Sequence, residues 1–201
     1  MFMESPQQSP ISESSLATYF KNRLSHYAQR LRPPPHDDTC WYLGSLLDRF
    51  GHSDQVFAYE EGRLTLRPLA LLYQDALDAN NERERCLILR QLGDLALFLG
   101  ALFPENFARR GIQRDYFIGM GGGAYDYLAE NARHNRHIFS ELSRMFARLL
   151  ELVANACSRK NNGSALDILA LYERWRETQD PRIKSQLQTL GISVEDNTSL
   201  Q

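Results

Sequence analysis

Apolar residues recur along most of the chain at the three-to-four-residue spacing of amphipathic helices. The clearest case is 134–157, where one face carries Ile138, Leu142, Met145, Leu149, Val153 and Ala156. The stretch 82–103 differs because it is apolar almost all round, which is typical of a central core helix. The pattern predicts an all-α fold, a compact multi-helix bundle built around 82–103.

Capping and breaking residues delimit the other predicted helices. We expect them at about 12–31, 40–50, 68–79, 104–110, 115–130, 164–178 and 180–191. Residues 56–66 are the exception, since they alternate weakly about Glu61-Gly62 and fit either a short β-hairpin or a loop. The polar ends 1–11 and 193–201 are expected to be disordered tails, which leaves 12–192 as a single helical domain.

Composition and charge limit the cellular compartment and the classes of partner that we expect. Basic and acidic residues are interspersed and the formal net charge is −2, so the basic surface of a nucleic-acid-binding protein is missing. Three widely spaced cysteines do not form a disulfide framework and favour a reducing compartment. The first ten residues lack the features of a signal peptide, and the longest apolar run, 92–103, is shorter than the roughly 20 residues of a membrane span. We expect a cytoplasmic protein that binds neither nucleic acid nor membrane.

Asp94 is the single acid inside the apolar run of the central helix. An unpartnered carboxylate is very costly to bury, so it must be paired, protonated or bound to a ligand. Arg90 lies one turn earlier, at the spacing of a helical ion pair, and an arginine from another helix would serve equally well. A small-residue stripe of Gly93, Ala96 and Gly100 falls on the opposite side and favours close approach of a neighbouring helix.

The glycine cluster GMGGGAY at 119–125 fits two structures. If a helix runs through it, each interior glycine costs about 1 kcal/mol relative to alanine. If the chain breaks there, a helix beginning at Ala124 presents free amides that would bind an anion. Candidate residues for such an anion site are Gly121, Gly122, Gly123, Arg109, Arg110 and Arg114.

Tyrosines gather beside these glycines. Tyr116, Tyr125 and Tyr127 are candidates for a partner-binding surface because tyrosine is enriched at interfaces. Together with Asp94, they complete the set of residues expected to bind a ligand or a partner.

A metal site is a further candidate. Glu130, His134, His137 and Glu141 would lie within a narrow arc if one helix spanned them. Carboxylates and imidazoles can ligate zinc, iron or manganese. However, the chain has no Glu-x-x-His pair of the kind that di-metal bundles use, and a solvated polar face explains the stripe equally well.

Two segments, LRQLGDLALFLGALFPE and DYFIGMGGGAYDYLA, resemble a group of small uncharacterised bacterial all-helical proteins with the pattern LGDxALF, FPE and YFxxMGxxAY. The likeness covers about 87–130 and, more faintly, 170–192. It implies a continuous helix through the glycines and a bacterial cytoplasm, and it carries no activity, cofactor or catalytic residue.

No nucleophile elbow, P-loop or acid–base pair is visible, so no catalytic residue is expected. The sequence predicts a non-enzymatic binding or regulatory helical module that docks a partner protein or a small ligand. It is compatible with a homodimer. The alternatives are a metal-dependent helical enzyme that uses the Glu/His stripe, and a sensor of a small anion or nucleotide.

Overall fold

The computed structural model describes residues 16–51, 58–60, 63–65, 69–109, 111–157 and 165–189. Its elements are α1 (Leu16–Ala28), α2 (Asp37–Gly51), β1 (Ala58–Glu60), β2 (Arg63–Thr65), α3 (Leu69–Leu77), α4 (Glu82–Leu102), α5 (Pro104–Ala108), α6 (Arg114–Asn131), α7 (Arg136–Ala156), α8 (Ala165–Thr178) and α9 (Pro181–Thr189). The predicted all-α bundle is confirmed. No helix of the described residues is both long and apolar enough to cross a membrane.

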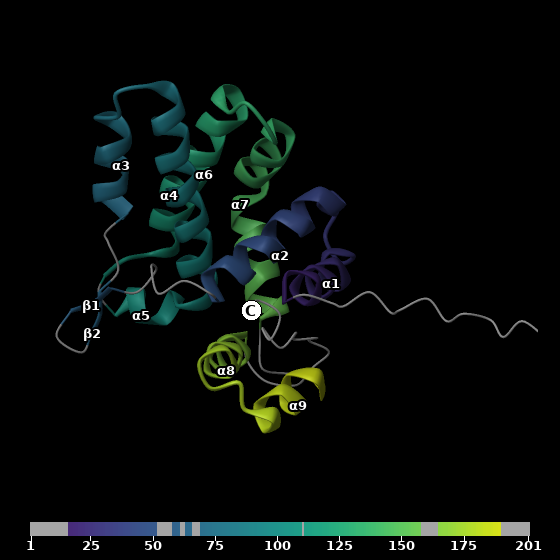
Figure 1. Cartoon of the computed structure of the whole chain (residues 1–201). Helices are drawn as coiled ribbons and strands as arrows, with labels where there is room; N and C mark the ends of the chain where they lie inside the picture. The colour runs from purple at the N-terminus through teal and green to yellow at the C-terminus, as the bar shows by residue number, and fades with distance from the viewer. Residues whose placement is uncertain are drawn as a thin grey trace, which may run out of the picture.

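The apolar helix α4 is central, as predicted. It packs against α3 on one side and against α6 and α7 on the other, while α1 and α2 form a pair that lies on α7 (Figure 1). Every residue from Leu92 to Ala101 is buried, because neighbours surround this part of α4. The short helices α8 and α9 pack on each other, and α8 reaches the bundle through α2.

Local chemistry explains several helix boundaries. The side chain of Asn81 caps α4 by accepting a hydrogen bond from the backbone N–H of Glu84, 2.9 Å away. Pro104 occupies the first turn of α5, where its missing N–H has no consequence. Asn135 adopts a left-handed conformation with φ of 61° immediately before α7. The helix α6 has already ended at Asn131, where the following Ala132 is extended with ψ of 147°, so the run 130–141 is not one helix.

The glycine cluster lies inside one uninterrupted helix, α6. Of the two structures that the sequence allowed, the continuous helix is therefore correct. Close packing requires a glycine at position 121, because a Cβ there would overlap the ring of Phe146 and press on Ala96. Gly93 of α4 likewise faces the ring of Tyr125. The predicted close approach at the small-residue stripe of α4 is confirmed.

Strands β1 and β2 pair antiparallel, with Ala58 opposite Thr65 and Glu60 opposite Arg63. This is the hairpin that was one of the two interpretations of 56–66. The predicted tails at 1–11 and 193–201 lie outside the described residues.

Candidate functional site

Asp94 lies at the junction of α2, α4 and α6. Its side chain is 4% exposed, and its Oδ1 accepts hydrogen bonds from the hydroxyls of Tyr42 at 2.6 Å and Tyr125 at 2.7 Å. The second oxygen, Oδ2, accepts a hydrogen bond from Nη2 of Arg49 at 2.7 Å. Nε of Arg90 is 3.9 Å from the same oxygen and donates to the hydroxyl of Tyr42 at 3.2 Å. Both carboxylate oxygens therefore have partners.

The ion pair expected between Asp94 and Arg90 is present, but the shorter contact comes from Arg49 on α2. Burial favours the neutral form of Arg49, yet the adjacent Asp94 carboxylate outweighs this and raises the pKa of the guanidinium. The buried carboxylate is thus compensated by a fixed positive charge, as the cost of burying an isolated charge demands.

The two tyrosines are locked in their protonated state. Burial first, and the neighbouring Asp94 second, raise the pKa of the Tyr42 and Tyr125 hydroxyls far above the ordinary range. Both phenols therefore stay protonated near neutral pH and donate to the carboxylate. This arrangement ties three helices together and gives both oxygens of Asp94 partners within the protein.

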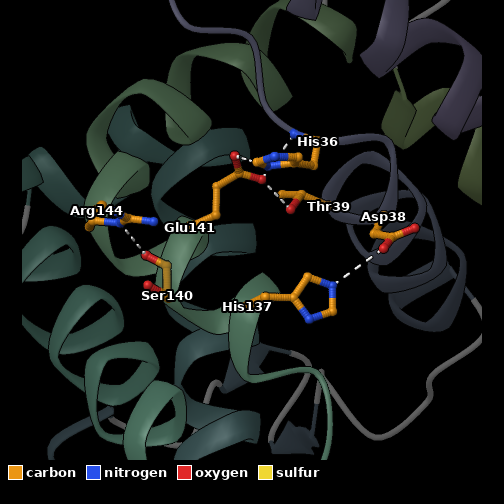
Figure 2. A network of polar contacts seen from close by, with 7 residues as sticks. All are labelled: His36, Asp38, Thr39, His137, Ser140, Glu141 and Arg144. Atoms are coloured by element: carbon orange, nitrogen blue, oxygen red, sulfur yellow. Dashed lines mark hydrogen bonds and ion pairs between the residues drawn. The ribbon is translucent and has the colours of Figure 1, made fainter.

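A second polar network joins α7 to the start of α2 (Figure 2). Glu141 is buried on α7, and its Oε2 accepts hydrogen bonds from the backbone N–H of His36 at 3.0 Å and from the hydroxyl of Thr39. Its Oε1 accepts one from Nδ1 of His36 at 2.8 Å. Burial acts to raise the pKa of Glu141, but the hydrogen bonds from Thr39 and His36 outweigh it and hold the pKa below its usual value. Glu141 therefore holds the first turn of α2 against α7, a helix that is far from α2 in the sequence.

The predicted metal stripe is not assembled. Glu130 lies in the last turn of α6, and His134 lies in the segment that connects α6 to α7. His137 and Glu141 lie on α7. His137 instead pairs across to Asp38 of α2 at 3.3 Å (Figure 2). Among the described residues no three histidine, cysteine, aspartate or glutamate side chains are grouped so that they could hold a metal ion. The premise that one helix spans 130–141 is wrong, since α6 ends at Asn131 and α7 begins at Arg136.

The glycine part of the predicted anion cradle is not formed, because here the helix is continuous. Gly121, Gly122 and Gly123 are interior residues of α6, so their amides belong to the helix and are not free. Arg114 donates to the backbone oxygen of Ala147 at 2.6 Å and pairs with Glu151 at 2.9 Å, which attaches the start of α6 to α7. Arg109 is exposed at the end of α5, and position 110 lies outside the described residues.

The predicted partner-binding tyrosines occupy three different environments. Tyr125 is fully buried in the core, stacked on Phe139. Tyr127 is half-buried, donates to Glu82 at 3.0 Å and accepts from Arg85 at 3.4 Å. Tyr116 is 36% exposed. These three side chains form no common surface.

Sequence reasoning missed an exposed apolar surface on α3. Leu69, Leu72 and Ala76 are buried, whereas Tyr73 is 48% exposed and Leu77 is 59% exposed. Exposed Ala70 precedes these two at helical spacing, so Ala70, Tyr73 and Leu77 form one stripe, called here the α3 stripe. Within the described part of the chain, α3 packs closely only on α4. The signal was the sequence LALLYQDAL, in which apolar residues also occupy positions outside the face formed by Leu69, Leu72 and Ala76.

Comparisons with protein-family models, with curated proteins and with solved structures gave no match to this chain.

Proposed function

We propose that this protein is a non-enzymatic docking module whose α3 stripe binds an amphipathic helix of a partner protein. The observation that carries the proposal is that α3 exposes apolar side chains beside the face that it packs on α4, with Tyr73 48% exposed and Leu77 59% exposed. Apolar side chains outside the buried face of a helix are suited to packing against a further helix. A partner helix on the outer side would complete this packing.

The shape of the stripe favours a single helix as the occupant. Ala70, Tyr73 and Leu77 extend over two turns of one helix, which matches the ridge that a packed helix inserts into the groove of another. The stripe exposes two large apolar side chains, Tyr73 and Leu77, whereas a standard stable interface buries roughly 800 Å² per partner from about 20–30 residues. A transient helix-on-helix contact fits this area better than a permanent dimer does.

The negative charge near the end of α3 indicates a second property of the partner helix. The exposed Asp78 follows the last residue of α3. The negative end of the helix dipole adds to its charge, and Nε of Arg85 already donates to the backbone oxygen of Ala76 at this end. We therefore expect the partner helix to carry lysine or arginine beside its apolar face.

Supporting this function, the carboxylates of the two buried polar networks are engaged within the protein. Asp94 accepts hydrogen bonds from Arg49 and two tyrosines, and Glu141 accepts them from His36 and Thr39. Each network holds helices together, which is the role of a scaffold for a binding surface.

The test compares capture from lysate of the source cell by three immobilised proteins: wild type, the double variant Tyr73→Glu/Leu77→Glu, and the matched control Gln74→Glu. Gln74 is exposed on the same helix, so its variant adds negative charge without removing the apolar stripe. We expect one protein to be retained by wild type and control and lost by the double variant, while all three unfold at similar temperatures because the altered side chains are exposed.

Equal retention by all three proteins would contradict the proposal. So would a wild-type homodimer that the double variant abolishes, because the occupant would then be a second copy of this chain. Sedimentation at several protein concentrations distinguishes that outcome from binding of a different protein.

A further inference from the structure

Arg49 and Arg90 form a positively charged pair above the buried Asp94. They come from different helices, α2 and α4, and both approach the same carboxylate oxygen, Oδ2, at 2.7 and 3.9 Å. Asp94 is almost fully buried, whereas the side chains of Arg49 and Arg90 are 51% and 40% exposed. The two guanidinium groups therefore lie beside each other at the protein surface with their shared counter-ion beneath them.

The charges in this cluster do not cancel. Two guanidinium groups face one carboxylate, and Oδ1 of Asp94 is already occupied by the hydroxyls of Tyr42 and Tyr125. The formal charge of the cluster is thus positive by one unit. A guanidinium has five N–H donors, and within the described residues Arg49 gives a hydrogen bond only to Asp94 and Arg90 only to Tyr42. Most of the donors therefore have no partner within the described residues.

The pair is also held in place. The guanidinium of Arg90 lies over the ring of Tyr42, 5.3 Å from its centroid, and Tyr42 is itself fixed by Asp94. Arg49 is fixed by its hydrogen bond to the same carboxylate. Side chains that are already ordered lose little further entropy when a ligand binds.

We propose that Arg49 and Arg90 bind a small monoanionic carboxylate ligand, which contacts both guanidinium groups. One carboxylate neutralises the excess charge, and its two oxygens match the planar fork of N–H donors. A phosphate monoester carries close to two negative charges at neutral pH and would reverse the charge instead. This site lies on α2 and α4, whereas the α3 stripe lies on α3. The proposed carboxylate site therefore does not depend on the docking function.

Arg83 provides a matched control. It is exposed on α4 seven residues before Arg90, hence on nearly the same face of the helix, and no charged partner is found for it among the described residues. It has the chemistry of Arg90 without a second arginine and a buried carboxylate beside it.

The experiment follows the arginine Nε–H signals by proton–nitrogen NMR during titration of the full chain with sodium acetate, at constant ionic strength set by sodium chloride. We expect saturable shifts for Arg49 and Arg90 and none for Arg83. Arg90→Gln weakens acetate binding about tenfold, as the loss of a charge-assisted hydrogen bond implies, and Arg83→Gln leaves it unchanged. At a tenfold excess of acetate over Kd, the unfolding temperature rises by about 3–6 °C.

Shifts that grow without saturation, or that are equal at Arg83, would show an adventitious ion only and overturn the proposal. Saturable binding of inorganic phosphate without binding of acetate would overturn the assignment of a carboxylate. If Arg90→Gln does not fold, the comparison of Arg49, Arg90 and Arg83 signals in the wild-type protein still decides the matter.

Discussion

Replacing Asp94 by asparagine is the most informative perturbation of the core. The change keeps the shape of the side chain but removes the charge that Arg49 compensates, and it places an NH₂ group where only acceptors fit. Either the two hydroxyls of Tyr42 and Tyr125 or the guanidinium of Arg49 must then face a donor. The expected effect is a large loss of stability.

The magnitude follows from the geometry. Removing one partner of a fully buried ion pair costs about 3–5 kcal/mol, but Arg49 is half exposed and can regain water, which reduces that share. Hydrogen bonds to a charged group contribute about 1.5–3 kcal/mol each, and Asp94 accepts two from buried phenols. We expect Asp94→Asn to lower the free energy of unfolding by about 3–4 kcal/mol, a large fraction of the roughly 5–15 kcal/mol of a typical domain.

Urea denaturation followed by circular dichroism measures this loss, and the unfolding temperature should fall by about 6–16 °C. The matched control is Glu130→Gln, which removes an exposed carboxylate from α6 and should change stability by less than about 0.5 kcal/mol. An Asp94→Asn protein that unfolds within about 1 kcal/mol of wild type would refute the view that this carboxylate holds the three helices together.

Two further substitutions test the packing and the second network. Gly121→Ala should lower the free energy of unfolding by about 1–3 kcal/mol because the new methyl group overlaps Phe146, whereas Gly123→Ala, with open space around it, should raise it by about 0.5–1 kcal/mol; equal effects in urea denaturation would contradict the packing. Because the pKa of Glu141 is lowered in the folded state, its stabilising contribution is complete above the unfolded-state pKa and is lost as the pH falls through the folded-state pKa. Stability measured from pH 6 to pH 3 should therefore fall less steeply for Glu141→Gln than for wild type, and parallel curves would show that Thr39 and His36 do not act on this carboxylate.

Local patterns in the sequence predicted most helices, because the spacing of apolar residues and the capping residues lie within or beside each helical segment. The apolar face of α7 and the all-round apolar α4 were readable in this way. Boundaries shifted where a capping residue was misassigned. The acids Asp37 and Asp38, expected to precede α2, lie in its first turn, because the backbone oxygen of His36 accepts the first helical hydrogen bonds.

The polar networks could be predicted only in part. The burial of Asp94 in an apolar helix indicated that it needed a partner, but Arg49 and Tyr42 lie 45 and 52 residues away in the chain. His36 lies 105 residues from Glu141. Such pairs depend on how the helices pack, and nothing in local spacing encodes them. The α3 stripe was missed for a related reason, since an apolar residue in the sequence does not reveal whether another helix covers it.

The docking function is tested most directly by photo-crosslinking in the source cell, with benzoylphenylalanine in place of Leu77 in one protein and in place of Gln91 in another. Gln91 is exposed on α4 and lies outside the α3 stripe. The account predicts a covalent adduct with another protein at position 77 only, and the crosslinked peptide should come from an amphipathic helix with basic residues beside its apolar face. No adduct at position 77, or the same adduct from both positions, would contradict a docking site on α3.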